Sequence, residues 1–159
     1  FYRWSDGNNE NPRVFHPTSD ITLTATFGPD TCVVTTLPYT MNFEDGNLYS
    51  NCWTRIDQDG DGHGWERVAS LNNPHNGLYY LRSESYINDV GSLNPDNWFI
   101  SPAIQLPEGT MPQLRWYAKG QDTSYFAEHY SVYLSTTGNS PADFTTVLYT
   151  GTTTKSWEE

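Results

Sequence analysis

Basic side chains are scarce in this sequence. Of its 159 residues, 8 are Lys or Arg and 19 are Asp or Glu, so the formal net charge at pH 7 is -11. Proteins bind nucleic acids and anionic membrane surfaces through clusters of Lys and Arg, which displace counterions or pair with headgroups. The sequence contains no such cluster. We therefore expect neither nucleic acid nor an anionic membrane surface as a partner.

Long apolar runs are also missing. None approaches the ~20 residues that span a bilayer, and the residues from Phe1 to Trp4 do not have the pattern of a signal peptide. We therefore expect no membrane insertion. Since the chain begins without Met and stops at Glu159 without a closing turn, we expect more protein on both sides in the natural product.

The sequence lacks the short motifs that mark common catalytic sites. It has no GxSxG elbow, no HExxH and no glycine-rich phosphate loop. Glu128 and His129 are adjacent in a predicted strand, so their side chains point to opposite faces and rarely share a site. Glu66, Glu84 and Glu128 remain candidates for the carboxylate pair of a glycosidase, because the sequence does not give the distances between them. The sequence favours a non-enzymatic protein, with hydrolysis as the alternative.

Only two cysteines are present, Cys32 and Cys52, and no Cys or His spacing indicates zinc. Two alternatives are open. A disulfide closing a loop of roughly 20 residues contributes about 3 kcal/mol through the unfolded state, whereas the other possibility is two buried free thiols. The disulfide is favoured, because both cysteines flank short strand-like runs that can lie side by side.

Short strand-like runs separated by turns make up most of the chain. Residues 21–27 alternate, with Ile21, Leu23, Ala25 and Phe27 on one face, and ten Pro with twelve Gly leave little room for long helices. Further strands are predicted at 32–36, 39–43, 52–56, 65–70, 78–82, 97–101, 113–118, 129–135 and 144–150. The pattern predicts an all-β fold, a jelly-roll-like antiparallel β-sandwich from about residue 31.

Aromatic residues are frequent, at 15% of the chain. Four tryptophans lie within predicted strands and are expected in the core: Trp53, Trp65, Trp98 and Trp116. Tyr86 and Tyr125 stand nearer turns, where an aromatic ring can stack on a sugar or anchor a protein partner.

The most specific chemical feature is the segment from Asp57 to Gly62, DQDGDG. Carboxylates at alternate positions, with glycines that let the backbone fold around a centre, are the hard oxygen ligands that Ca²⁺ prefers. An EF-hand needs an acid at the twelfth position, which here is Val68. We predict structural calcium held by Asp57, Asp59 and Asp61, with Glu44 as a further ligand. The alternative is a solvated acidic turn.

Residues 1–28 resemble the C-terminal part of the InlB B-repeat-like β-modules that occur in tandem on bacterial surface proteins. The resemblance is carried by the segments 4–7, 11–12 and 22–27 (WSDG, NP and TLTATF). Gly28, Pro29 and Asp30 then break the pattern and are the predicted boundary. The chain is thus expected to contain a partial small β-repeat over 1–28 and a sandwich over 31–159.

Several stretches of the second part resemble, in order and in spacing, the cleaved-adhesin family of jelly-roll modules, also described as choice-of-anchor J domains. The matching segments are LPY at 37–39, NFE at 42–44, CW at 52–53, DQDGDGHGW at 57–65, SESY at 83–86, LNPDNWFISP at 93–102 and EHYSVYLSTTGN at 128–139.

This resemblance implies a binding module of a secreted or surface-exposed multidomain bacterial protein. It places the family's early acidic position at Glu44 and its loop acids at Asp57, Asp59 and Asp61, around structural calcium. Its implied partners are a host or environmental glycan or protein, and other domains of the same polypeptide. Family members continue beyond the Trp157 segment into further strands, which this sequence does not include. The alternatives are an accessory domain of a secreted protease or glycosidase, a hydrolase, and a structural spacer.

Overall fold

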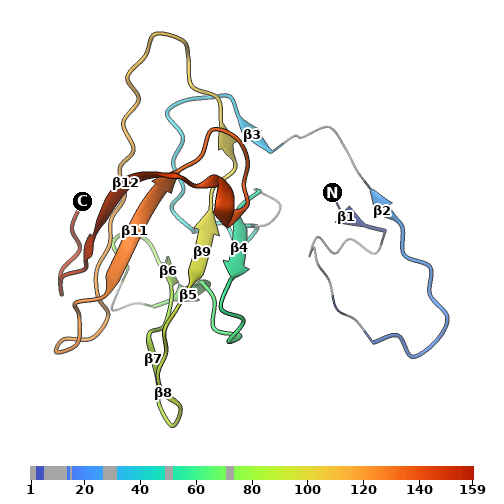
Figure 1. The fold of residues 1–159 in the computed structure, drawn as a ribbon, viewed down its shortest axis with the longest axis horizontal. Helices are drawn as coiled ribbons and strands as arrows, with labels where there is room; N and C mark the ends of the chain where they lie inside the picture. Colours follow the sequence, from blue (N-terminus) through green and yellow to red (C-terminus); the bar gives the residue numbers. More distant parts are fainter. Residues whose placement is uncertain (1–2, 6–13, 15, 27–31, 49–51, 71–73) are drawn as a thin grey trace.

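The computed structural model describes residues 3–5, 14, 16–26, 32–48, 52–70 and 74–159, and these ranges form an all-β fold without an α-helix (Figure 1). The elements are β1 (Arg3–Trp4), β2 (Ala25–Thr26), β3 (Val33–Val34), β4 (Thr54–Asp57), β5 (Glu66–Ala69), β6 (Tyr79–Arg82), β7 (Tyr86–Ile87), β8 (Gly91–Ser92), β9 (Asn97–Ile100), β10 (Ala103–Ile104), β11 (His129–Leu134), the 3-10 turn η1 (Pro141–Asp143) and β12 (Thr146–Thr152). No helix in the described ranges is long and apolar enough to cross a bilayer.

Antiparallel pairing dominates the described strands, as the sequence predicts. The antiparallel pairs are β1–β2, β4–β9, β5–β6, β7–β8 and β11–β12. The pair β3–β10 is parallel, which the sequence analysis did not anticipate. A parallel pair needs a long crossover connection, and here that connection contains most of the other strands.

Strand β9 lies at the centre of the packing, because its successive side chains point to opposite faces. Phe99 stacks on Trp53, with ring centroids 4.6 Å apart, and Phe43 and Trp65 lie at 6.0 and 6.5 Å. Burial of such rings supplies much of a small domain's stability. The predicted core positions of Trp53 and Trp65 are therefore right in this cluster, where both are half-buried.

The opposite face of β9 carries a second aromatic cluster. Trp98 packs against Tyr133 of β11 at 5.4 Å and against Phe144, just before β12, at 5.6 Å. These contacts bring the β11–β12 hairpin against the β4–β9 pair (Figure 1). One strand thus joins the two layers of the sandwich.

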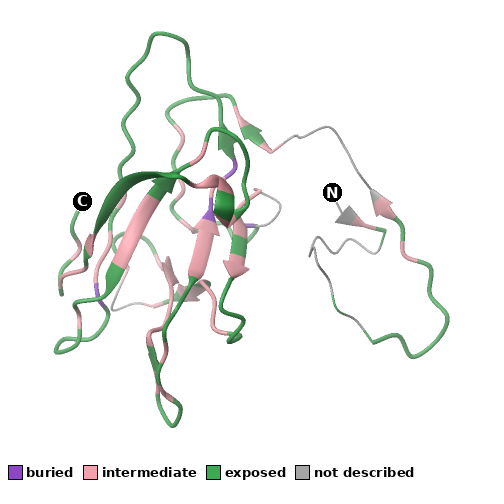
Figure 2. Ribbon diagram, viewed as in Figure 1, coloured by how far each residue is buried: buried purple, intermediate pink, exposed green. Residues whose placement is uncertain are grey.

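Full burial is rare among the described residues. Leu48 and Ile100 retain 6% and 5% of their exposure, and most other apolar side chains in the central strands are half-buried (Figure 2). Strand β12 stays exposed over nearly its whole length. Because apolar burial is limited, cross-links and polar contacts carry a larger share of the stability than in a well-filled core.

Several predicted strands are shorter or missing; of 32–36, for example, only Val33–Val34 is a strand. The segment 39–43 is not a strand, because Phe43 has a φ of 63° and its carbonyl accepts from the Arg67 side chain instead of a neighbouring strand. Of 113–118, only Ala118 forms a bridge, to Glu158. The alternating run at 21–27 is a strand only at β2, and Phe27 lies outside the described residues.

The N-terminal segment forms its own small pair, β1–β2, which stands to one side of the other strands in Figure 1. Trp4 pairs with Ala25, and the Thr24 amide donates to Ser5 Oγ at 3.1 Å. The predicted boundary at 28–30 lies outside the described residues.

Cys32 and Cys52 form a disulfide, the first of the two alternatives that the sequence left open. Their Cα atoms are 5.3 Å apart and their sequence separation is 20 residues. The bond joins the residue before β3 to the residues that lead into β4, so it ties the outer parallel pair to the centre of the fold.

We predict that the double variant Cys32→Ser/Cys52→Ser loses about 3 kcal/mol of unfolding free energy, because its unfolded chain regains the entropy of an open loop of this length. Urea unfolding of both proteins measures the difference. As a control, a reductant should destabilise the wild type and leave the double variant unchanged. Equal midpoints for the oxidised wild type and the variant would contradict the prediction.

Candidate metal centre

The acidic loop begins where β4 ends. Asp57 is the last residue of β4 and pairs with Asn97, the first residue of β9. Beyond this pair, the Gln58 amide donates to the Asp96 carbonyl at 3.0 Å, and the Asp96 amide donates to Asp59 Oδ2 at 3.0 Å. The loop is therefore fixed on one side by the segment that leads into β9.

Asp57 folds the loop around its own carboxylate. Its Oδ1 accepts the Gly60 amide and its Oδ2 accepts the Gly62 amide, both at 2.8 Å. Gly60 and Gly62 have φ values of 72° and 85°, a region that costs other residues conformational energy. The glycines thus allow the tight bend, and the bend brings the next two carboxylates back towards Asp57.

The loop brings three predicted ligands together. Carboxylate oxygens of Asp57, Asp59 and Asp61 lie within 4.8 Å of one another. A side-chain hydrogen bond with Asp59, followed by the amides of Gly62 and Gly60, lowers the pKa of Asp57. Carboxylates this close repel one another unless a proton or a cation lies between them. The donor set consists of hard oxygens, so the residues fit a calcium ion, which would supply positive charge to a cluster that otherwise repels itself.

Glu44 is not part of this group of three. Its Oε1 accepts the amides of Leu78 and Tyr79, at 2.8 and 2.9 Å, where β6 begins. The amides of Tyr79 and Leu78 lower the pKa of Glu44, with a smaller contribution from Arg67. The carboxylate thus anchors β6 to the segment before β4, and its role as a metal ligand stays a prediction.

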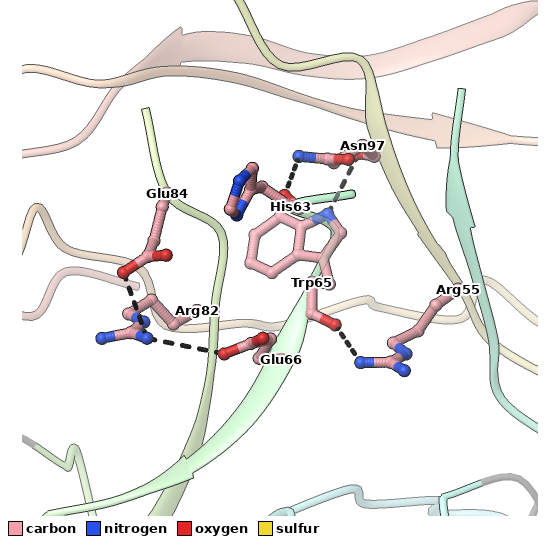
Figure 3. Close-up of polar contacts among 7 residues, drawn as sticks. All are labelled: Arg55, His63, Trp65, Glu66, Arg82, Glu84 and Asn97. Atoms are coloured by element: carbon pink, nitrogen blue, oxygen red, sulfur yellow. Dashed lines mark hydrogen bonds and ion pairs between the residues drawn. The ribbon is translucent and has the colours of Figure 1, made fainter. Parts of the chain in front are cut away.

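Asn97 is an oxygen donor beside the loop that the sequence analysis did not single out. Its Nδ2 donates to the His63 carbonyl at 2.9 Å (Figure 3). It also donates to Ser83 Oγ at 3.1 Å. Its Oδ1 is buried without a hydrogen-bond partner among the described residues. A Cβ at Gly64 would lie within 4 Å of both this oxygen and the Asp57 side chain. The sequence alone does not show that Asn97 lies near Asp57, because the β4–β9 register brings the two residues together.

The carboxylates considered for hydrolysis are engaged in other contacts. Arg82 Nη2 lies 3.5 Å from Glu66 and 3.1 Å from Glu84, so one guanidinium holds both (Figure 3). Glu128 Oε1 accepts Ser85 Oγ at 2.6 Å. Two carboxylates on one arginine form a surface ion-pair network, whereas a glycosidase needs two that face an open cleft.

Comparison with known proteins identifies relatives of most of the chain. The profile of the Cleaved Adhesin Domain family matches residues 36–158. Gingipain R1 of Porphyromonas gingivalis is 43% identical over 119 residues, which are 71% of this chain and 6% of that protein. Hemagglutinin A of the same species is 40% identical over 111 residues, or 67% of this chain and 5% of that protein. The chain thus spans only a small part of the length of these relatives.

Solved structures of the same kind of domain are also similar. The K1 Cleaved Adhesin domain of Lys-gingipain from P. gingivalis superimposes with a TM-score of 0.59 at 35% identity, covering 67% of this chain and 69% of that chain. The K3 domain of the same protein gives a TM-score of 0.56 at 33% identity, with the same coverage. These matches agree with the all-β sandwich described above.

We predict that Glu44→Gln lowers the free energy of unfolding, because a neutral amide oxygen accepts the Leu78 and Tyr79 amides more weakly than a carboxylate does. The folded-state pKa of Glu44 lies below its ordinary value. The ionised carboxylate therefore contributes fully to the unfolding free energy at pH values above the pKa of Glu44 in the unfolded chain. That contribution is lost as the pH falls from about 5 to about 3. The difference in unfolding free energy between wild type and variant should therefore narrow as the pH falls over this range.

Urea unfolding at several pH values, in the presence of a chelator, measures this gap. Glu108→Gln is the matched control, because Glu108 is exposed in the loop after β10 and no hydrogen bond to its side chain is recorded in the described part of the chain. A gap that stays constant with pH would show that the Glu44 charge does not hold β6.

Proposed function

The chain belongs to the Cleaved Adhesin Domain family, and from this premise we propose that residues 31–159 are a non-enzymatic adhesion module that binds a glycan or a protein outside the cell. The match over residues 36–158 carries the proposal, together with the similarity to gingipain and hemagglutinin segments. The module acts as one part of a larger secreted or surface-exposed polypeptide, whose N-terminal neighbour here is the partial β-repeat of residues 1–28.

Calcium stabilises the module in this proposal. The support is the convergence of Asp57, Asp59 and Asp61 at the end of β4, where carboxylate oxygens of the three residues lie within 4.8 Å of one another. Asn97 Oδ1 is an additional oxygen near Asp57. The ion holds the loop against β9, so its effect is on stability and on the shape of the loops at this end of the sandwich.

Exposed tyrosines on projecting segments are the proposed contact surface. Tyr86 is 62% exposed on the β7–β8 hairpin, which extends away from the sandwich, and Tyr125 is 82% exposed in the loop before β11 (Figure 1). Tyrosine combines a large apolar ring with a hydroxyl group, which suits both sugar stacking and protein contacts.

An accessory role next to a protease domain is the second candidate. It is favoured by the similarity to two relatives from P. gingivalis, Lys-gingipain and Protease PrtH, the second of which is 35% identical over 100 residues. In that case the module brings a neighbouring catalytic domain to its substrate. Purified alone, it binds protein and hydrolyses nothing.

We predict that calcium raises the melting temperature of the chain relative to a chelator. An ion at 100 times its dissociation constant adds about 2.7 kcal/mol to the unfolding free energy. Asp59→Asn should remove most of this shift, since it takes one charged oxygen from the cluster, and Glu108→Gln should keep it. Identical wild-type midpoints with calcium and with chelator would contradict calcium stabilisation.

We predict saturable binding of the chain to members of a panel of glycans and extracellular matrix proteins. Tyr86→Ala or Tyr125→Ala should weaken that binding at least about fivefold, as truncation of an anchoring residue does. Met111→Ala is the control, because Met111 is 95% exposed on a different loop. Surface plasmon resonance measures the affinities, and uniform absence of binding at every calcium level would leave only a spacer role.

A further inference from the structure

A small hollow lies between the β11–β12 hairpin and the last residues of the chain, away from the acidic loop. Its volume is about 120 Å³, and three of the residues that line it are aromatic: Trp116, Tyr130 and Tyr149. The remaining wall contains Thr152, Thr153 and Thr154 from the end of β12, and Glu158 and Glu159. No part of the candidate metal centre contributes to it.

The β11–β12 register builds the aromatic wall. Tyr130 pairs with Gly151 and Val132 pairs with Tyr149. The Tyr149 ring lies along its own strand over Gly151, where an added Cβ would collide with Tyr149 Oη. A glycine inside an exposed strand otherwise weakens it, so Gly151 has a definite role here: it leaves the space that the ring occupies.

Trp116 completes the wall from the other side. Its Nε1–H donates to Tyr130 Oη at 3.1 Å, and its ring centroid lies 5.6 Å from that of Tyr149 at an interplanar angle of 66°. The rings of Tyr130 and Tyr149 are 5.2 Å apart. Trp116 was predicted to lie in the core; it is half-buried, as Trp53 and Trp65 are, and it lines this hollow.

The hollow is acidic on one side. Glu158 and Ala118 exchange two backbone hydrogen bonds, of 3.0 and 3.1 Å, which fix the position of Glu158. Within the described part of the chain, no ion pair or hydrogen bond is recorded for its carboxylate, whereas Glu159 is held by Arg115 and by Tyr117. A hydrogen bond with Tyr130, burial and, more weakly, the charge of Glu158 raise the pKa of Tyr149.

Aromatic walls with one unpaired carboxylate favour a cation. The negative faces of aromatic rings attract an ammonium group, most strongly when the group is desolvated, and a carboxylate adds a direct ion pair. A lysine ammonium is a compact charge, so it fits a hollow of about 120 Å³ better than the larger planar guanidinium of an arginine does. The net charge of -11 also favours a basic partner at long range.

We propose that this hollow binds the side-chain ammonium of a lysine presented by a partner protein, with Glu158 as its counter-ion and Trp116, Tyr130 and Tyr149 as its aromatic walls. The inference deepens the proposed adhesion function by naming the chemistry of a protein ligand. For its biological role, but not for its test, it rests on that function.

The test titrates the full chain with Nα-acetyl-lysine amide and follows the indole N–H signal of Trp116 by ¹⁵N-correlated NMR, assigned by its loss in Trp116→Phe. The expected result is a saturable shift of this signal. The Nε-acetylated form of the probe has the same stem without the charge, and it should give no saturable shift. Equal shifts for both probes would overturn the proposal, because the hollow would then bind apolar stems.

Two variants test separately the charge of Glu158 and the position of the Tyr149 ring. Glu158→Gln keeps the backbone bridge to Ala118 and should lower the association constant about two- to fivefold, as the loss of one partner of an exposed ion pair does, while Glu108→Gln makes the same change of net charge elsewhere and should have no effect. Gly151→Ala should displace the Tyr149 ring and weaken binding similarly, with the dispersion of the other amide signals showing that the fold persists. Unchanged binding in Glu158→Gln would overturn the assignment of the counter-ion and with it the proposal.

Two further titrations identify which kind of cation the hollow prefers. Choline and Nα-acetyl-arginine amide are titrated in the same way, and the lysine probe should bind more tightly than either. Tighter binding of choline would overturn the proposal in favour of a small quaternary ammonium ligand. Failure of the lysine probe while the glycan and protein panel still gives binding refutes this inference alone. Saturable binding of the lysine probe, together with no binding to any member of the glycan and protein panel, refutes the adhesion proposal alone.

Discussion

The antiparallel pairing of β4 with β9 is the constraint on which the rest of the structure depends. Its register sets Asp57 opposite Asn97 and Ile56 opposite Trp98. The same register turns Trp98 towards the β11–β12 hairpin and Phe99 towards Trp53. Because side chains alternate along a strand, a slip of one residue would exchange the two aromatic clusters and move Asn97 away from the acidic loop. The aromatic packing and the position of the candidate metal centre thus both follow from the register of the β4–β9 pair.

Polar contacts from side chain to backbone take over where strand pairing stops. Arg67 lies 3.3 Å over the Tyr79 ring and binds the carbonyls of Phe43 and Glu44, while the Glu44 carboxylate holds the start of β6. Strand β6 is in turn paired with β5, which follows the acidic loop. With few fully buried side chains, this network and the disulfide fix the connecting segments that a larger core would otherwise hold.

The sequence was sufficient to predict features that depend on local spacing. Alternate carboxylates with interleaved glycines predict the cluster of Asp57, Asp59 and Asp61, because the chemistry lies within one turn. The all-β class follows equally from the short runs and frequent turns. Features that depend on tertiary register were not predictable: the placement of Glu44 on the β6 amides, the buried Asn97 oxygen, and the missing strand at 39–43, whose backbone is bound by a side chain 24 residues away. For the same reason the sequence does not show that Trp116 lines a hollow.

The two charged sites of the molecule differ in the kind of cation that they favour. A divalent ion requires several oxygen ligands to replace its hydration shell, and the acidic loop supplies carboxylates from three residues at one point. The hollow beside β12 has a single unpaired carboxylate and three aromatic rings, an environment that replaces the hydration of an ammonium far better than that of a metal ion. The proposed calcium ion at the loop and the proposed lysine at the hollow therefore would not compete. In these two proposals stabilisation and recognition are carried by sites that share no residue, so a substitution at one site should leave the other intact.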